Sequence, residues 1–282
     1  MSLVNLNNML FEAFKGGYAV GAFNVYNIED ITAVVNAAEE AKSPVILMTS
    51  SSAIVHSGME ELASIIKCRA NNTTVPICLH LDHATDYKKI IKAMYIGYSS
   101  VMYDGSLLSY EKNVNNTKEI VKVAHSLNVT VEAEIGRVGN SEEGNKELHM
   151  VLSKPDEVKS FVEETGIDAC AIAIGSSHGM QKQKANLNFK LLDRIRNEVD
   201  LPLVLHGSSG VIEAELTEAG RRGIQKVNIG TRLKRVFSDM LKKNVAGNKE
   251  IHNHVKLLRP SINAVKDEVM HKMKILGCIN KI

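Results

Sequence analysis

The chain has 282 residues, of which 44% are hydrophobic and 23% are charged, and its formal net charge is +2. This is ordinary globular composition, and so small a net charge gives no electrostatic reason to expect nucleic acid or a membrane surface as a partner. No apolar run approaches the ~20 residues of a membrane span, and no signal-peptide pattern occurs. We therefore expect a cytoplasmic protein without disulfides, in which Cys78 and Cys170 are small buried side chains.

Short apolar runs alternate with longer segments of helical periodicity along the whole chain. Eight of these runs are predicted to be strands, because most are nearly continuous in apolar residues, as parallel strands covered on both faces are. They span residues 19–23, 44–49, 76–81, 100–103, 130–135, 169–174, 203–206 and 226–229. Eight βα units predict an α/β protein, a single-domain (β/α)₈ TIM barrel over residues 1–282. An open doubly wound sheet is the alternative, although no GxGxxG turn follows any strand.

Helices are expected between the strands, where apolar residues recur every three or four positions. Asn27 is a candidate N-cap for the helix after the first strand, and Ser153 for the helix before the sixth. Residues 138–152 break this rhythm, since they contain Gly139, Gly144 and several charges without an apolar period. A long irregular segment in a compact domain is usually a lid or disordered.

Three histidines fall at the carboxyl ends of predicted strands. His83, His178 and His206 follow the third, sixth and seventh strands, and barrel enzymes place their catalytic groups at these ends. Neutral imidazoles suit zinc, and three protein ligands leave one coordination position open for a substrate. A lone histidine is more often structural, but three at one barrel mouth favour a zinc site.

Carboxylates accompany these histidines. Asp82 precedes His83 at a strand end, where it can exchange a proton with a substrate hydroxyl, or alternatively cap the next helix. His80 shares a strand face with Asp82, and we expect it to orient other site residues. Asp104 and Glu134 lie at the ends of the fourth and fifth strands.

Two short loops are candidates for phosphate binding. Residues 207–210 and 228–231 follow the last two strands and are small and hydroxyl-rich. Barrels usually bind phosphate at this position, through backbone N–H groups that glycine leaves accessible. The alternative is that they are two tight turns.

Together these motifs resemble the class II fructose/tagatose-bisphosphate aldolase family over essentially the whole chain. The resemblance implies a zinc-dependent (β/α)₈ enzyme that reversibly cleaves a ketose 1,6-bisphosphate to dihydroxyacetone phosphate and glyceraldehyde 3-phosphate. The motifs that carry it are AFN at 22–24, HLDH at 80–83, VEAE at 131–134, AIGSSHG at 173–179, LVLHG at 203–207 and NIGT at 228–231.

The resemblance also implies roles for individual residues. Asp82 would act as the acid/base at the C4 oxygen, and Glu142 as the loop carboxylate that moves the C3 proton. A monovalent cation, Na⁺ or K⁺, often assists phosphate binding in this family, whose members are homodimers or homotetramers. The implied metal residues are His83, His178 and His206, with Glu134 and Asp104 nearby. The implied substrate-binding residues are Asn24, Ser50, Gly179, Gly207, Ser208, Ser209, Asn228, Ile229, Gly230 and Thr231.

The substrate and the reaction class each have alternatives. Residues 175–180 and 230–232 are closer to tagatose-bisphosphate members, so we expect tagatose 1,6-bisphosphate, with fructose 1,6-bisphosphate as the alternative. A Schiff-base aldolase needs a lysine inside the barrel, but Lys226, the only lysine in a predicted strand, is expected where its strand enters the barrel. A metallohydrolase would usually carry a His-x-His pair after the first strand, which is absent. Asp82 and Glu142 argue against a non-catalytic sugar-phosphate-binding subunit.

Overall fold

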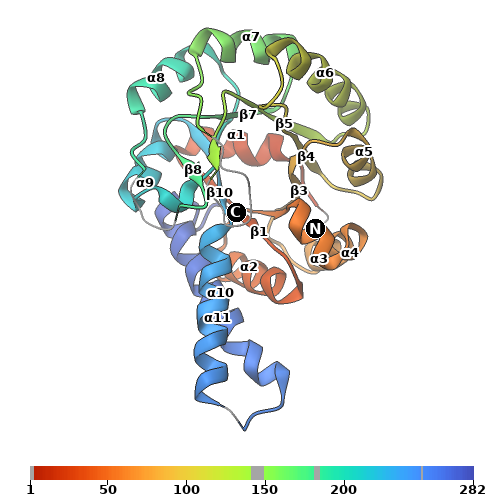
Figure 1. Cartoon of the computed structure of the whole chain (residues 1–282), viewed down its shortest axis with the longest axis vertical. Coiled ribbons are helices and arrows are strands. Elements are labelled where there is room, and N and C mark those ends of the chain that lie inside the picture. The colour runs from red at the N-terminus through yellow and green to blue at the C-terminus, as the bar shows by residue number, and fades with distance from the viewer. Residues whose placement is uncertain (1–2, 141–148, 181–184, 249) are drawn as a thin grey trace.

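The chain folds as a closed barrel of eight parallel strands surrounded by helices (Figure 1). A computed structural model describes residues 3–140, 149–180, 185–248 and 250–282. Around the barrel the strand order is β1-β10-β9-β7-β5-β4-β3-β2, which confirms the predicted (β/α)₈ architecture. The barrel strands are β1 (Val20–Asn24), β2 (Val45–Thr49), β3 (Ile77–Ala84), β4 (Ser100–Tyr103), β5 (Thr130–Ile135), β7 (Ala169–Ile172), β9 (Leu203–Leu205) and β10 (Ile224–Ile229).

One helix closes the end of the barrel at which the strands begin. In α1 the buried side chains are Leu6, Met9, Leu10 and Ala13, a spacing that forms a single helix face. The Leu6 N–H donates to Thr130 Oγ1, at the start of β5. The opposite end of the barrel therefore carries the mouth. The helices are α1 (Leu6–Gly16), α2 (Ile28–Ala41), α3 (Ser51–Ser57), α4 (Met59–Asn71), α5 (Tyr87–Tyr95), α6 (Tyr110–Ser126), α7 (Pro155–Thr165), α8 (Phe189–Glu198), α9 (Glu213–Arg221), α10 (Thr231–Gly247) and α11 (His254–Leu276), with a 3₁₀ turn at Ser208–Gly210.

β3 runs three residues further than the sequence predicts, and it is irregular at its end. Its register with β4 shifts between Leu81 and Ala84, and His83 has a φ of 48°. Successive side chains of a regular strand point to opposite faces, whereas a bulge re-aims one of them. The irregularity lets Asp82 and His83, which are adjacent in sequence, both reach the cavity at the mouth.

The two predicted helix caps have different outcomes. Asn27 caps α2, because its side chain accepts from the Asp30 N–H. The prediction for Ser153 is wrong, since the N-cap of α7 is Lys154. The Ser153 hydroxyl instead donates to the Ile135 carbonyl and accepts from the Ala173 N–H, and so joins the ends of β5 and β7.

The irregular segment 138–152 is anchored at both of its described ends. The short strands β6 (Gly139–Asn140) and β8 (Ser177–His178) pair in parallel, and Arg137 forms an antiparallel bridge with Val151. The sixth predicted strand, 169–174, is too long, because β7 ends at Ile172. His178 lies on the separate strand β8. Residues 141–148, which include Glu142, lie outside the described residues.

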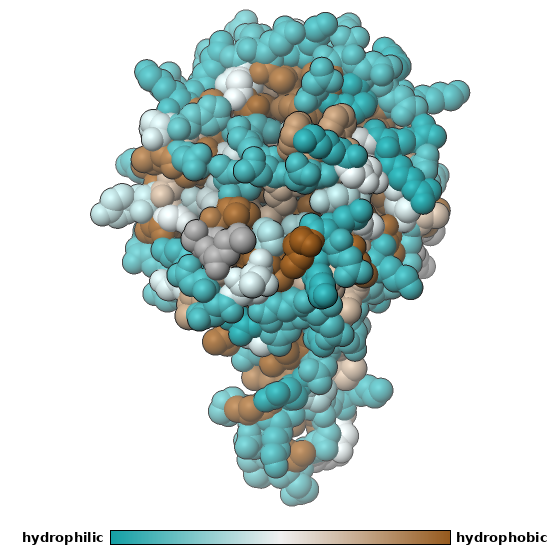
Figure 2. All heavy atoms as spheres, turned by 180° about the vertical axis from the view of Figure 1, so that it is seen from behind, coloured by the Kyte–Doolittle hydropathy of each residue, from teal (hydrophilic) through white to brown (hydrophobic). Residues whose placement is uncertain are grey.

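The helices α10 and α11 form a hairpin that projects beyond the barrel (Figure 1). Leu233 is the one buried side chain described in α10. Seen from behind, the molecule shows mainly hydrophilic side chains with scattered apolar ones (Figure 2). Within the described part of the chain, no helix has the length and apolar character to cross a bilayer.

Candidate active site at the barrel mouth

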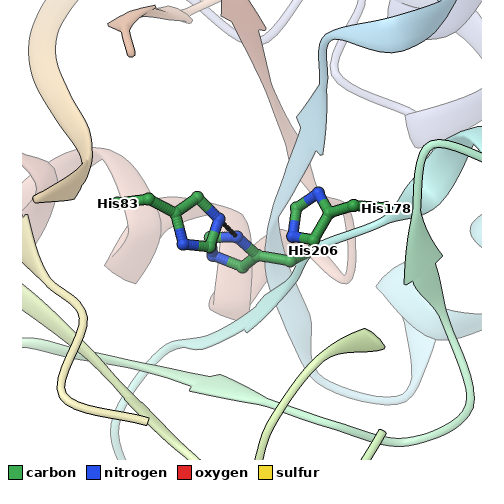
Figure 3. A group of neighbouring side chains, drawn as sticks. All are labelled: His83, His178 and His206. Atoms are coloured by element: carbon green, nitrogen blue, oxygen red, sulfur yellow. Dashed lines mark hydrogen bonds between the residues drawn. The ribbon is translucent and has the colours of Figure 1, made fainter. Parts of the chain in front are cut away.

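The three predicted histidines converge at the mouth, although they come from distant parts of the sequence (Figure 3). His83 Nε2 lies 2.8 Å from His206 Nδ1. One ring nitrogen from each of His83, His178 and His206 lies within 4.8 Å of the others. Tetrahedral zinc with Zn–N bonds of about 2.1 Å places its ligand nitrogens roughly 3.4 Å apart. The cluster therefore has the dimensions of a three-imidazole metal site.

Carboxylates contact two of these rings at the nitrogen that does not face the neighbouring histidine. His83 Nδ1 lies 2.8 Å from Asp104 Oδ2, and His206 Nε2 lies 2.8 Å from Glu132 Oε1. A carboxylate that accepts the proton of one ring nitrogen leaves the other nitrogen able to bind a metal. Both rings thus fit a metal centre by their orientation as well as by their spacing.

Asp82 lies beside this cluster with both carboxylate oxygens engaged. Asn24 Nδ2 donates to Asp82 Oδ2 at 2.8 Å, and Asn228 Nδ2 donates to Asp82 Oδ1 at 3.2 Å. Burial alone would raise the pKa of Asp82, but the nearby positive charge of His83 holds it below its usual value. Asp82 does not cap the next helix, where the cap is Asp86. An ionised, oriented carboxylate of this kind can accept a proton from a substrate hydroxyl.

Glu134 and Asp104 form a second potential metal-binding group with His83. Burial, followed by the nearby Asp104 charge, raises the pKa of Glu134 to about 8. Glu134 Oε1 accepts from the Val138 N–H, and Oε2 has no hydrogen-bond partner among the described residues. Glu134 therefore has an oxygen to offer to a metal or to a substrate.

The two candidate phosphate loops lie side by side and are joined by a hydrogen bond from Ser208 Oγ to the Asn228 carbonyl. Gly207 has a φ of 66°, and a Cβ there would meet the backbone of Ser177 at 2.5 Å. A Cβ at Gly230 would collide with the Asn24 side chain. Small residues at these positions are therefore required by the close approach of neighbouring segments.

One cavity of about 660 Å³ brings most of the predicted site together. His206 is fully buried below it, and neither Gly179 nor Ile229 lines it. Glu142 lies outside the described residues. The predicted residues that line the cavity are Asn24, Ser50, Asp82, His83, Asp104, Glu134, His178, Gly207, Ser208, Ser209, Asn228, Gly230 and Thr231.

The predicted position of Lys226 at the entry of its strand is wrong. β10 begins at Ile224, two residues earlier than predicted, so Lys226 lies within the strand and is fully buried in the barrel. Its Nζ lies 2.8 Å from Glu132 Oε2. The alternation of strand residues could have revealed this, because Lys226 and Asn228 are two positions apart and share a face. Lys226 Nζ contacts Glu132 and Asn228 and does not line the cavity, whereas the lysine of a Schiff-base aldolase must reach the substrate.

A closed (β/α)₈ barrel with histidines and carboxylates at its mouth is the arrangement typical of enzymes with this fold. The family model for class II fructose-bisphosphate aldolase matches residues 4–281. The chain therefore belongs to the class II fructose-bisphosphate aldolase family, whose members are aldehyde-lyases that act on sugar phosphates and are generally zinc-dependent.

Solved structures support this membership. The YdjI aldolase of Escherichia coli K12 is 34% identical, with 99% of each chain covered and a TM-score of 0.87. A putative fructose-1,6-bisphosphate aldolase of Coccidioides immitis is 30% identical, with 97% of this chain and 96% of that chain covered and a TM-score of 0.87. The fructose-bisphosphate aldolase Fba of Campylobacter jejuni shares the fold at 22% identity, with 100% and 97% covered and a TM-score of 0.85.

Proposed function

We propose that the protein is a zinc-dependent aldolase that reversibly cleaves a ketose 1,6-bisphosphate to dihydroxyacetone phosphate and glyceraldehyde 3-phosphate. The observation that carries this proposal is the convergence of His83, His178 and His206 beside Asp82. The three imidazoles would hold the zinc, with Glu134 and Asp104 close by. When bound, zinc supplies a Lewis acid for the charge that develops on the ketose oxygens.

The chain's own residues account for the proton transfers and the binding of substrate. In cleavage, Asp82 takes the proton of the C4 hydroxyl and the C3–C4 bond breaks. Asn24 and Asn228 hold Asp82 in place for this transfer. Glu142 then returns a proton to C3 of the dihydroxyacetone phosphate half. Asn140, two residues before Glu142 in the sequence, pairs with His178.

We propose that the phosphate of the dihydroxyacetone phosphate half lies against the loops after β9 and β10, assisted by a monovalent cation, Na⁺ or K⁺. These loops lie at the usual phosphate position of barrels. Asn24 and Ser50 would also contact the substrate, because both line the same cavity. The proposed substrate-binding set is Asn24, Ser50, Gly179, Gly207, Ser208, Ser209, Asn228, Ile229, Gly230 and Thr231.

Replacement of one metal ligand tests the reaction class. We expect His206→Ala to lose both bound zinc and cleavage of fructose and tagatose 1,6-bisphosphates, because a fully buried imidazole leaves the centre. His252→Ala, at an exposed position between α10 and α11, is the matched control. Zinc content by elemental analysis and triose phosphate release are the measurements. Zinc binding by the wild type without any cleavage would instead favour a non-catalytic sugar-phosphate-binding subunit.

A paired assay tests the substrate. We propose tagatose 1,6-bisphosphate as the preferred ketose, on the pattern of Gly230 and Arg232, with fructose 1,6-bisphosphate as the alternative. The two differ only in configuration at C4, the carbon whose oxygen Asp82 serves. A kcat/KM that favours the fructose epimer by tenfold or more, about 1.4 kcal/mol in transition-state free energy, would contradict this preference and leave the reaction class intact.

Hydrogen exchange at C3 tests Glu142. Glu142→Gln should suppress exchange between dihydroxyacetone phosphate and deuterated water, followed by NMR, by about 10²–10⁴-fold, as expected for loss of a general acid–base group. Zinc content should not change. Glu143→Gln is the matched control, and normal exchange in Glu142→Gln with loss in Glu143→Gln would assign the role to the neighbour. Normal exchange in both would refute a loop base and leave Glu134 as the next candidate.

We also propose that the enzyme is a cytoplasmic homodimer or homotetramer. Family membership supports this assembly, and light scattering coupled to gel filtration measures it. A monomer of 31.0 kDa at micromolar concentration would contradict it.

A further inference from the structure

A group of polar side chains fills the barrel beneath the cavity. His80, Glu132 and Lys226 come from β3, β5 and β10, and each is fully buried. Barrel interiors are usually packed with branched apolar side chains, and a buried charge is costly unless it is paired. Lys226 Nζ lies 2.8 Å from Glu132 Oε2, and His80 Nε2 lies 3.7 Å from the same oxygen. The ion pair lies where an ordinary barrel would carry apolar packing.

Lys226 contacts partners that lead to two different parts of the site. Its first partner, Glu132, uses the other carboxylate oxygen, Oε1, to contact His206 Nε2 at 2.8 Å. Its second partner is Asn228, whose Oδ1 accepts from Lys226 Nζ at 2.7 Å. Asn228 in turn donates from Nδ2 to Asp82 Oδ1. Lys226 therefore contacts the residue that holds His206, a proposed zinc ligand, and also the residue that holds Asp82, the proposed acid/base.

The hydrogen-bonding capacity of these groups makes the arrangement directional. An ammonium only donates, so it fixes which end of the Asn228 amide faces it, and the NH₂ end must then face Asp82. If the amide were reversed, its oxygen would face the Asp82 carboxylate. Lys226 also pairs by charge with Glu132 Oε2, an oxygen that has no hydrogen-bond partner among the described residues, and Oε1 is left to accept the proton of His206 Nε2. This leaves His206 Nδ1 facing the centre of the three histidines.

We propose that Lys226 is a positioning residue of this aldolase, which orients the zinc ligand His206 through Glu132 and the acid/base Asp82 through Asn228. The inference rests on the proposed function, since it assigns a purpose to contacts of that site. The alternative is that Lys226 only balances the buried charge of Glu132. In that case the orientations of His206 and Asp82 would not depend on the hydrogen bonds of Lys226.

Two substitutions separate positioning from charge balance. Lys226→Met removes both the charge and the donors, whereas Lys226→Gln removes the charge but keeps an NH₂ group that can donate to Glu132 and Asn228. We expect Lys226→Met to bind zinc about 10- to 100-fold more weakly, the usual effect of losing a group that orients a metal ligand. With saturating zinc its kcat should fall by more than its KM rises, because the backbone N–H groups proposed to bind the phosphate are unchanged. Lys226→Gln should recover much of both losses.

Zinc affinity is measured by competition with a chromophoric chelator. The tautomer of His206 is measured in the metal-free protein by ¹⁵N NMR, with His206→Ala used for assignment. The wild type should carry the proton on Nε2, and Lys226→Met should show a mixture of tautomers. Lys272→Met is the matched control, because Lys272 is a buried lysine whose ion pairs are with Glu213 and Glu268 and not with a proposed zinc ligand or Asp82. It should leave zinc affinity and the His206 tautomer unchanged.

Equal zinc affinity, tautomer and kcat in Lys226→Met and the wild type would overturn the inference. Equal impairment in Lys226→Gln and Lys226→Met would also overturn it, because charge alone would then matter. If Lys226→Met does not fold, Lys226→Gln alone decides the question. Loss of the proton from His206 Nε2, or of most of the zinc affinity, in Lys226→Gln would refute the positioning role. A wild type that neither binds zinc nor cleaves a ketose bisphosphate would refute the proposed function instead.

Discussion

At the scale of single residues, a proton between two of the proposed zinc ligands can take the place that we propose for zinc. Burial would lower the pKa of His83, but the Asp82 charge and the hydrogen bond to Asp104 raise it to about 10. Burial, followed by the His83 charge, holds the pKa of His206 well below its usual range. In the metal-free protein a protonated His83 can therefore donate from Nε2 to a neutral His206 Nδ1, 2.8 Å away. A proton then lies where we propose that zinc binds.

This competition makes a prediction for the pH dependence of zinc binding. Zinc must displace the His83 proton, and at every pH below about 10 that proton is bound in the metal-free state. Zinc affinity should therefore rise roughly tenfold for each pH unit between pH 6 and 8. Competition titrations at several pH values, corrected for the chelator's own protonation, measure the slope. Asp104→Asn should flatten it, because the charge that helps to hold the proton is gone. A pH-independent affinity in the wild type would show that His83 binds zinc without losing a proton.

At the scale of elements, the backbone brings the site together through pairings that are local in space but distant in sequence. The register shift in β3 directs Asp82 and His83 to one cavity. The pairing of β6 with β8 holds His178 beside the segment that leads to Glu142. Ser153 ties the end of β5, which carries Glu134, to the residue after β7.

Ser153→Ala tests this last connection. The Ser153 side chain is buried, and its loss leaves the Ala173 N–H and the Ile135 carbonyl without their partner. Such groups each cost about 1–3 kcal/mol when they are buried and unsatisfied, so with two of them the free energy of unfolding should fall by about 2–6 kcal/mol. Ser64→Ala is the matched control, because the exposed Ser64 hydroxyl only donates to Glu60 O within its helix. Equal stabilities in denaturant titrations of the two variants would contradict this account of Ser153.

The strands show which features of the fold a single sequence can predict and which it cannot. Apolar runs and their polar ends predicted the barrel, the bounds of β4 and β5, and the convergence of His83, His178 and His206. These features follow from local patterns and from a general rule of the fold. The bulge in β3, the place of His178 on a separate strand and the inward orientation of Lys226 depend on pairing partners. A single sequence does not identify those partners, so strand ends were misplaced by up to three residues at β3.

At the scale of the whole molecule, the two ends of the barrel have different tasks. α1 and its apolar face close the end where the strands begin, whereas the opposite mouth gathers buried carboxylates and imidazoles around one cavity. This division is the usual one in (β/α)₈ enzymes. A ligand that binds only the folded state stabilises that state by mass action. Zinc bound at the mouth should therefore raise the free energy of unfolding of the whole barrel.

The most direct test of a zinc-dependent aldolase is the removal and return of metal from the purified protein. Exhaustive chelation should abolish cleavage of fructose and tagatose 1,6-bisphosphates, and about one equivalent of zinc per chain, or cobalt in its place, should restore it. Borohydride added with substrate should not inactivate the enzyme, because the proposed mechanism uses no Schiff base. Full activity after exhaustive chelation, or covalent trapping of substrate by borohydride, would contradict the account.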